Sequence, residues 1–322
     1  MAERTGAGEW QRVKIVDRVQ ESERIISLEL VAVDGGELAP FDAGAHIDVR
    51  LDGNIVRQYS LLNDPGERHR YRLGVLREEA SRGGSEAIHR LVVGDELDVS
   101  CPRNHFALHA SAETVLLIAG GVGVTPIMAM GHQLHRDGIP FTMHYCVRNE
   151  ACAAFAQELS ESPFGHNVHL HIDSGPPEQR FVAMDAVRNV TPGSHLYICG
   201  PGGFIDHVAK MAAFAGWSGE QIHSERFTAA PLAAESFTVV AQQSGIEVLI
   251  RPGQRISEAL LEAGVPIEMS CEAGVCGTCY TRVIEGEPDH KDSFQTAAER
   301  ASNEGIAICC SGSKSARLVL DI

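Results

Sequence analysis

The chain has 322 residues, of which 44% are hydrophobic and 22% are charged, a composition typical of a globular protein and not of a disordered one. This length is too great for one ordinary core and fits two or three domains of about 100 to 150 residues each. The formal net charge of -16 argues against nucleic acid or an anionic membrane surface as the main partner, because neutralising phosphates requires clustered Lys and Arg.

The sequence contains no sign of membrane insertion or export. No stretch approaches the roughly 18 to 20 apolar residues of a membrane span, and residues 1–12 lack the apolar core of a signal peptide. We therefore expect a cytoplasmic protein. In that compartment the nine cysteines are expected to be metal ligands, redox groups or small core residues and not disulfides.

The first third of the chain is rich in short strand-like runs. Alternating or β-branched segments occur from residue 13 to about residue 106, in the order VKIVDRV, IISLEL, HIDVRL, IVRQYSLL, YRLGVL and ELDVS. Turn sequences separate them at residues 34–36, 52–54 and 64–66. This pattern predicts a small antiparallel β-barrel over residues 1–108.

From residue 114 the pattern changes to TVLLIAGGVGVTPI, which predicts an apolar strand, a glycine turn and a helix through residues 128–135. The apolar runs FTMHYCV, NVHLHID and SHLYICG follow, with helical segments between them. Such alternation predicts an α/β nucleotide-binding domain with a parallel sheet over residues 109–228.

A third domain is predicted over residues 236–322, after a linker, TAAPLAAES, at residues 228–236. FTVVAQQ and IEVLIRPG flank Ser244 and Gly245 as a hairpin. Ser257 is expected to cap a helix that Gly264 ends, and LVLDI is expected to form the last strand.

Four cysteines of this third domain have a distinctive spacing. Cys271, Cys276 and Cys279 follow C-x4-C-x2-C, and 29 residues separate Cys279 from Cys309, which is the plant-type 2Fe-2S arrangement. Four thiolates on a glycine-containing loop allow the backbone to approach the cluster closely. Structural zinc also takes four thiolates, but more usually from paired C-x2-C knuckles. Cys310 is the alternative to Cys309 as the fourth ligand, since spacing does not separate adjacent residues.

These segments carry a family resemblance. CEAGVCGTC, followed by ICCSGSKSARLVLDI at the terminus, resembles the ferredoxin domain of the phthalate dioxygenase reductase family, which includes the reductases of vanillate demethylases. The resemblance implies a β-grasp 2Fe-2S ferredoxin domain, with Cys309 as the ligand and Cys310 as the apolar residue after it. Gly312 stands where the family usually has arginine, which puts in doubt any partner contact made by that arginine.

A flavin is needed chemically, because nicotinamide releases two electrons together and a 2Fe-2S cluster accepts one. Arg57-Gln58-Tyr59-Ser60 resembles the R-x-Y-S flavin motif of ferredoxin reductases, and Arg82-Gly83-Gly84-Ser85 can wrap a terminal phosphate. Arg57 offers charge, Tyr59 a flat aromatic surface, and Ser60 a hydroxyl for the reactive edge.

By resemblance the flavin is FMN, because the family's glycine-serine loop ends on a monophosphate. The resemblance also implies flavin contacts from Val75, Leu76 and Thr125, and an aromatic wall from Phe227. Ordinary interdomain packing is the alternative for Phe227.

Two further segments predict the nicotinamide site. The loop with Gly120, Gly121 and Gly123 lies between an apolar strand and a helix, where a pyrophosphate can meet backbone amides. Cys199-Gly200-Pro201 resembles the C-G-P motif that places a thiol beside the nicotinamide ring, with a buried inert cysteine as the alternative.

One carboxylate predicts the choice between NADH and NADPH. Asp173 can bind a ribose hydroxyl and would disfavour a 2′-phosphate, so NADH is expected. Arg148 weakens this argument, because an arginine near the adenine ribose can accept a phosphate.

The motifs together predict an NADH-dependent oxidoreductase that transfers electrons through FMN and a 2Fe-2S cluster, with Ser60 and Cys199 at the reacting atoms. By family, the acceptor is the terminal component of a Rieske-type oxygenase or demethylase. The alternatives are a haem-thiolate monooxygenase as acceptor, or a non-catalytic zinc-stapled nucleotide-binding module. Residues 262–289 carry six carboxylates and one arginine, which predicts an acidic rim for a basic partner or a merely solubilising face.

Overall fold

The computed structural model describes residues 10–52, 55–79, 83–227, 235–269, 272, 274, 277–292 and 294–322. The chain divides into two compact units, Met1–Arg226 and Phe227–Ile322. Within the described part, no helix combines the length and the apolar character that a membrane crossing requires. The expected domain limits at residues 108 and 236 stay predictions, and most of the expected linker lies outside the described residues.

The N-terminal unit begins with the antiparallel barrel that the strand-like runs predict, and one short helix, α1 (Gly84–Arg90), belongs to it. Its strands are β1 (Trp10–Gln20), β2 (Ile25–Ala32), β3 (Ala45–Leu51), β4 (Ile55–Ser60), β5 (Tyr71–Leu76), β6 (Glu96–Ser100) and β7 (Arg103–Asn104). The strand order is β4-β3-β6-β1-β2-β5, with β7 paired to β3. An isolated bridge between Leu61 and Leu73 brings the two edge strands together and nearly closes the barrel.

The unit continues with a five-stranded parallel sheet in the order β10-β9-β8-β11-β12, which confirms the predicted α/β fold. Its strands are β8 (Thr114–Gly120), β9 (Phe141–Val147), β10 (Val168–Ile172), β11 (Ser194–Cys199) and β12 (Ile222–Glu225). Its helices are α2 (Val124–Asp137), α3 (Ala156–Glu161), α4 (Ala183–Val187) and α5 (Gly202–Phe214). Short 3-10 turns lie at Gly121–Gly123, Glu150–Cys152, Gly165–Asn167, Pro177–Gln179 and Gly219–Gln221.

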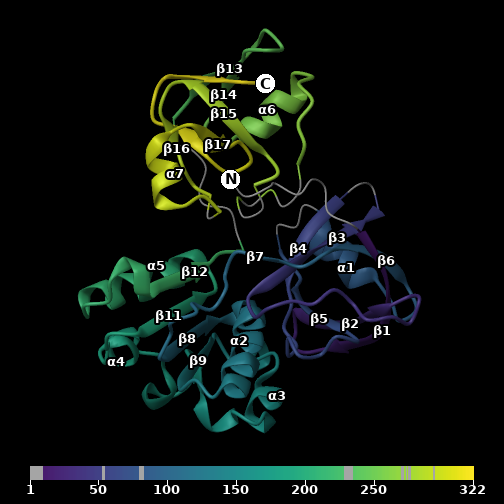
Figure 1. Ribbon diagram of the computed structural model, residues 1–322, viewed down its shortest axis with the longest axis vertical. Helices are drawn as coiled ribbons and strands as arrows, with labels where there is room; N and C mark the ends of the chain where they lie inside the picture. Colours follow the sequence, from purple (N-terminus) through teal and green to yellow (C-terminus); the bar gives the residue numbers. More distant parts are fainter. Residues whose placement is uncertain are drawn as a thin grey trace. The chain divides into compact units, whose positions relative to one another are not determined.

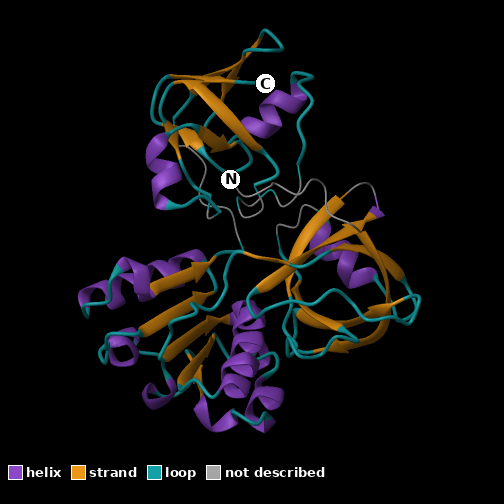
Figure 2. Cartoon of the chain, in the orientation of Figure 1, coloured by secondary structure: helices purple, strands orange, loops and turns teal. Residues whose placement is uncertain are grey.

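Helices cover both faces of this sheet (Figures 1 and 2). On one face, Ile118 and Ile198 pack with α4 and α5. On the other, Leu117 packs with α2 in a cluster that also contains barrel residues, among them Leu62 and Phe106. This cluster joins the barrel to the parallel sheet, although each also has an apolar cluster of its own, and it explains why the two form a single compact unit.

The C-terminal unit is a mixed sheet in the order β14-β13-β19-β15-β17, as expected for the β-grasp domain. The sheet strands are β13 (Phe237–Ala241), β14 (Ile246–Ile250), β15 (Tyr280–Glu285), β17 (Gly305–Ala307) and β19 (Arg317–Leu320). A separate two-stranded pair joins β16 (Pro288–Asp289) and β18 (Gly312–Ser313), and the helices are α6 (Ile256–Glu262) and α7 (Ala297–Ser302).

One local prediction in this unit is wrong. Ser257 does not cap α6, because the helix begins one residue earlier and Arg255 occupies the N-cap position, where its backbone N–H donates to Glu258 Oε2 at 3.2 Å. Ser257 is instead fully buried inside the first turn, where its backbone N–H donates to the Ile308 carbonyl at 3.1 Å. Gly264 follows the helix in the left-handed conformation, as expected.

Candidate functional site

The structure brings the two predicted flavin motifs together. Arg57, Gln58, Tyr59 and Ser60 lie on β4, paired with β3. A Cβ atom on Gly84 would lie 2.6 Å from Cγ of Arg57, so the arginine side chain crosses directly over this glycine. Only glycine, which has no side chain, leaves room for the Arg57 side chain at this position, and this explains why residue 84 is a glycine.

The loop before α1 has a backbone conformation that allows a ligand to approach it closely. Gly83 has φ 87° and occupies the N-cap position of the helix. The Ser85 hydroxyl accepts from the backbone N–H of Glu78 at 3.1 Å, which ties the loop to the segment after β5. Arg82 lies outside the described residues. Backbone amides and a hydroxyl in this arrangement suit a phosphate.

The remaining expected flavin contacts differ in their surroundings. The Val75 side chain is buried in the barrel core, so its side chain faces away from any ligand on the outside of β5. Leu76 points outward and packs against the core shared with the parallel sheet. Thr125 is buried on the first turn of α2, where its Oγ1 donates to the Val122 carbonyl at 3.0 Å.

The two nucleotide motifs also meet, at the carboxyl ends of the neighbouring strands β8 and β11. A Cβ atom on Gly123 would lie 2.4 Å from the Cys199 carbonyl oxygen and 2.6 Å from the Gly200 nitrogen. A Cβ atom on Gly120 would lie 3.1 Å from Pro201 Cδ. The glycines therefore let two loops touch backbone to backbone, while Gly121 adopts φ 54° at the turn into α2.

A buried carboxylic acid lies where the barrel meets the parallel sheet. Glu225 ends β12, is 8% exposed, and pairs in register with Cys199. Its Oε2 accepts from the Ser60 hydroxyl of the flavin motif at 3.5 Å. Burial raises the pKa of Glu225 to about 8, against the lowering effect of the Ser60 hydrogen bond.

Cys199 itself is fully buried. Burial raises the pKa of its thiol, and the neighbouring Glu225 adds to the rise. The sulfur is therefore a neutral thiol at physiological pH, which suits packing and positioning and not nucleophilic attack.

The residues expected at the ribose lie at the same edge of the sheet. Arg148 follows β9 and Asp173 follows β10, and both are exposed. The Asp173 N–H donates to the Val147 carbonyl at 3.0 Å, and the Ser174 N–H donates to the Arg148 carbonyl at 2.9 Å. Both side chains thus lie outside the core, at the edge of the sheet that also carries the loops after β8 and β11.

In the C-terminal unit, two of the four expected cluster ligands are described. Cys279 and Cys309 are buried, at 4% and 1% exposure, while Cys271 and Cys276 lie outside the described residues. Gly274 and Gly277 have φ 77° and φ 74°, the left-handed conformation that a tightly wrapped loop requires.

Cys310 is as buried as Cys309, and a Cβ atom on Gly274 would lie 2.4 Å from the Cys310 sulfur. The assignment of Cys309 as the fourth ligand stays a prediction. Phe227, the first residue of this unit, is 39% exposed, and its expected place at the flavin also stays a prediction.

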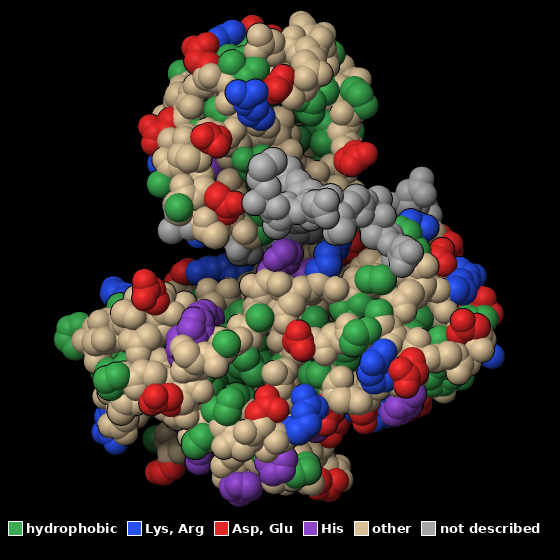
Figure 3. Space-filling model, viewed as in Figure 1, with side chains coloured by type: hydrophobic (Ala, Val, Ile, Leu, Met, Phe, Trp, Pro, Cys, Tyr) green, Lys and Arg blue, Asp and Glu red, His purple; other side chains and the backbone are tan. Residues whose placement is uncertain are grey.

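The expected acidic rim is partly neutralised by basic residues from elsewhere in the same unit, and Figure 3 shows both signs of charge on its visible face. Four of the six carboxylates have such partners. The pairs are Glu272 with Arg255 at 3.9 Å, Glu285 with Arg317 at 3.3 Å, Glu287 with Lys314 at 3.0 Å, and Asp289 with Lys291 at 3.0 Å.

Comparison with known proteins gives matches to two family models, an oxidoreductase NAD-binding domain over residues 117–210 and a 2Fe-2S iron-sulfur cluster binding domain over residues 239–313. Vanillate O-demethylase oxidoreductase of Pseudomonas sp. (strain HR199 / DSM 7063) is 47% identical over 302 residues, covering 92% of this chain and 95% of the relative. The solved structure of phthalate dioxygenase reductase, described as modular for electron transfer from pyridine nucleotides to a 2Fe-2S centre, matches with TM-score 0.75 and 36% identity, covering 97% and 98% of the two chains. The chain belongs to the phthalate dioxygenase reductase family.

A second solved structure resembles this phthalate dioxygenase reductase family member over its whole length. It is an intact type IV self-sufficient cytochrome P450 monooxygenase, with TM-score 0.78 and 31% identity, covering 100% of this chain and 43% of the P450 protein. The three-part organisation of the family therefore also occurs fused to a cytochrome P450.

Sequence reasoning missed one site residue of this family member, Glu225. The glutamate lies 165 positions from Ser60, so no local motif links the two residues. The available signal was a charged residue at the end of a short apolar-containing segment, which the structure shows as β12, next to β11 and its Cys199 motif.

Proposed function

We propose that this protein oxidises NADH, holds the two electrons on FMN, and delivers them singly through a 2Fe-2S cluster to the terminal component of a Rieske-type oxygenase or demethylase. FMN, when bound, accepts a hydride and releases single electrons, which the cluster carries onward. The observation that carries the proposal is the contact of Ser60, from the flavin motif, with Glu225 beside Cys199, from the nucleotide motif.

The residues present fit each group. The bare backbone of Gly84 leaves room for the Arg57 side chain, and Gly83, with φ 87°, would let the FMN phosphate approach the backbone beside that arginine. The loops at Gly123 and Gly200 touch backbone to backbone at the start of a 14-residue helix, a position that suits the NADH pyrophosphate.

The C-terminal unit supplies the chemistry of the iron cluster. Cys271, Cys276, Cys279 and Cys309 would hold it as four thiolates, and glycines with positive φ flank them. The match of this segment to the 2Fe-2S family model favours the cluster over structural zinc.

The chain's own groups prepare the reacting region. Glu225 is protonated at neutral pH, so it places no negative charge where a hydride must be accepted. The Ser60 hydroxyl donates to Glu225 at 3.5 Å, which holds the Ser60 side chain beside that carboxyl, where the reactive edge of the flavin would lie. The buried Cys199 thiol would lie beside the nicotinamide and orient the ring by packing.

The choice of NADH rests on Asp173, whose carboxylate would bind a ribose hydroxyl and repel a 2′-phosphate. We place the reaction in the cytoplasm, where thiol ligands stay reduced. The oxygenase partner is supported by the relative's name, vanillate O-demethylase oxidoreductase. Contact with that partner would be transient, since the reductase must be reloaded by NADH between electron transfers.

A haem-thiolate monooxygenase is the second candidate acceptor, favoured by the match of the whole chain to part of a self-sufficient cytochrome P450. The two acceptors are separated by mixing the NADH-reduced protein with each class of oxygenase and measuring which one turns over its substrate. Turnover with neither class would refute both assignments.

The chemistry is tested on the purified protein under anaerobic conditions. We expect flavin and iron-sulfur absorbance, bleaching of both by NADH, and two irons per chain with a reduced-cluster spin resonance signal. A colourless protein containing zinc would refute the proposal.

A further inference from the structure

The two faces of β5 have different roles. Tyr71, Leu73 and Val75 point into the barrel core and are at most 1% exposed. The alternate residues, Arg72, Gly74 and Leu76, therefore point out of the barrel. Leu76 packs against the core that the barrel shares with the parallel sheet. The outer face of β5 is thus the side on which the nucleotide-binding part lies.

The contact at Gly74 is very close. A Cβ atom there would lie 2.6 Å from Cγ2 of Thr125 and 3.1 Å from Cζ of Phe155. Phe155 has φ 61°, a strained conformation for a bulky residue that persists only where the surroundings enforce it. This conformation places the Phe155 ring against β5, directly before α3 begins.

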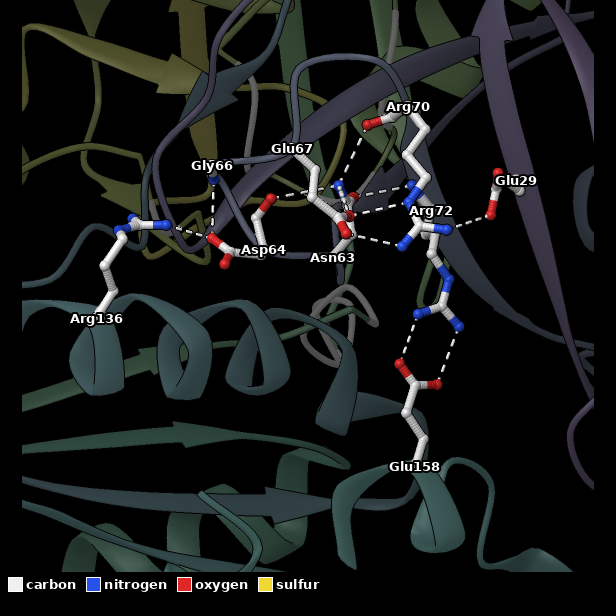
Figure 4. Close-up of polar contacts among 9 residues, drawn as sticks. All are labelled: Glu29, Asn63, Asp64, Gly66, Glu67, Arg70, Arg72, Arg136 and Glu158. Atoms are coloured by element: carbon white, nitrogen blue, oxygen red, sulfur yellow. Dashed lines mark hydrogen bonds and ion pairs between the residues drawn. The ribbon is translucent and has the colours of Figure 1, made fainter. Parts of the chain in front are cut away.

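An ion pair joins β5 to α3 beside this contact (Figure 4). Arg72 donates to both carboxylate oxygens of Glu158, with Nη1–Oε1 at 2.5 Å and Nη2–Oε2 at 3.0 Å. The Arg72 side chain is only 18% exposed. Its backbone is fixed as well, because its N–H donates to the buried Asn63 side chain at 2.9 Å. Two parallel hydrogen bonds of this kind fix orientation as well as distance.

A second ion pair crosses the same boundary at the far end of α2. Arg136, in the last turn of the helix, pairs with Asp64 in the loop after β4. Asp64 also accepts from the Gly66 N–H at 2.8 Å, which holds its carboxylate in place. On the barrel side, Arg70 pairs with Glu67 and Glu29 and stiffens the loop that carries these groups.

The two crossing ion pairs complement the apolar contact between them. Apolar side chains resist separation but are weakly directional, so packing alone leaves the two parts free to slide or rotate slightly. Arg72–Glu158 restrains the α3 side and Asp64–Arg136 restrains the end of α2. Thr125, which meets β5 at Gly74, lies on the first turn of α2, directly after the Gly121–Gly123 turn that suits the pyrophosphate.

We propose that Arg72 and Glu158, assisted by Asp64 and Arg136, are positioning residues. They fix the position of the barrel, which would carry FMN, relative to the loops at Gly123 and Gly200, which would carry NADH. The inference rests on the proposed function, since it concerns hydride transfer from NADH to FMN. Misplacing reacting atoms by about 1 Å costs on the order of a hundredfold in rate, so a smaller loosening has a measurable effect.

The test compares full-length, cofactor-loaded variants in anaerobic stopped-flow reduction by NADH. We expect Arg72→Gln and Glu158→Gln each to lower the limiting rate of flavin reduction by about five- to tenfold, with flavin content unchanged. The kinetic isotope effect with NADH deuterated at the transferred position should rise toward its full value. The exchanged pair, R72E/E158R, should recover at least half of the loss on a logarithmic scale.

A matched control is Arg12→Gln, which removes ion pairs to Glu96 and Asp98 that lie entirely within the barrel. This control should leave the limiting rate unchanged. Amide hydrogen exchange supplies a readout independent of turnover: residues 71–76 and 156–161 should exchange faster in Arg72→Gln than in Arg12→Gln.

Rates within twofold of wild type in Arg72→Gln and Glu158→Gln would overturn the proposal. A loss of equal size in Arg12→Gln, or a loss that R72E/E158R does not recover, would overturn it too, because the effect would then be one of general stability. If NADH fails to reduce the wild-type flavin, the proposed function fails, and this inference falls with it.

Discussion

Replacing Glu225 by glutamine is expected to remove a pH-dependent cost of folding. The buried carboxyl has a pKa of about 8 in the native protein and an ordinary value of 4.5 when unfolded. Between these values the native state binds a proton that the unfolded state has lost, so the wild-type free energy of unfolding falls as pH rises. At pH 7 the interval is 7 minus 4.5, or 2.5 units, which corresponds to roughly 3 kcal/mol.

The assay is urea unfolding of wild type and Glu225→Gln at pH 5, 6, 7 and 8, followed by tryptophan fluorescence. Both tryptophans, Trp10 and Trp217, lie in the N-terminal unit, and Trp217 is buried with its Nε1 donating to the Val187 carbonyl at 2.7 Å. The stability of the variant relative to wild type should be about 2 to 3 kcal/mol larger at pH 7 than at pH 5.

The exposed Glu220, on the turn before β12, provides the control. Glu220→Gln should follow the wild-type pH dependence throughout. A difference between Glu225→Gln and wild type that stays constant from pH 5 to pH 8 would refute the reasoning, because it would show that Glu225 does not bind its proton more tightly in the native state.

The same titration should appear in the chemistry. Above about pH 8 an ionised Glu225 would place negative charge where a hydride is accepted, so flavin reduction by NADH should slow with an apparent pKa near 8. In Glu225→Gln this decline should disappear. If the rate of flavin reduction in wild type does not change up to pH 9.5, Glu225 has no part in hydride transfer, even if the stability result holds.

Three further outcomes are expected. Gly123→Ala would force its Cβ to within 2.4 Å of the Cys199 carbonyl oxygen, so the KM for NADH should rise by about tenfold or more. The control is Gly219→Ala, whose Cβ meets nothing within 4 Å and which should leave the KM unchanged. Equal KM values in the two variants would contradict this. Cys309→Ser should lose the cluster by iron analysis and spin resonance while Cys310→Val retains it, and the reverse pattern would make Cys310 the ligand. Asp173→Ser should raise the ratio of kcat/KM for NADPH to that for NADH by about tenfold, and an unchanged ratio would remove Asp173 from the ribose site.

Local patterns were sufficient to predict most of the elements of this fold. Barrel strands such as β5 have an inward apolar set, here Tyr71, Leu73 and Val75, and a period of two is visible in sequence without any knowledge of the partner strands. The glycine loops at Gly83 and Gly123 were predictable for a similar reason, since close approach to phosphate excludes a side chain. The Ser257 cap failed because it depended on the helix beginning one residue later than it does.

The acidic segment at residues 262–289 shows where local counting fails. Arg317 and Lys314 lie about 30 positions from the carboxylates they neutralise, so charge summed along a segment overstated the charge of the surface. Ion pairs between distant residues of a folded unit depend on the order of its strands. Counting the charged residues in one segment gives no information about that order.

The sequence by itself determined the cofactor chemistry of this protein, because thiolate spacing and glycine turns are short-range requirements written into a few adjacent residues. Only the tertiary structure decided how those sites are coupled: it placed Glu225 against Ser60 across 165 positions and Arg72 against Glu158 across 86. Burial and ion pairing depend on which distant segments share a core, and that is a property of the packed chain and not of any stretch of it.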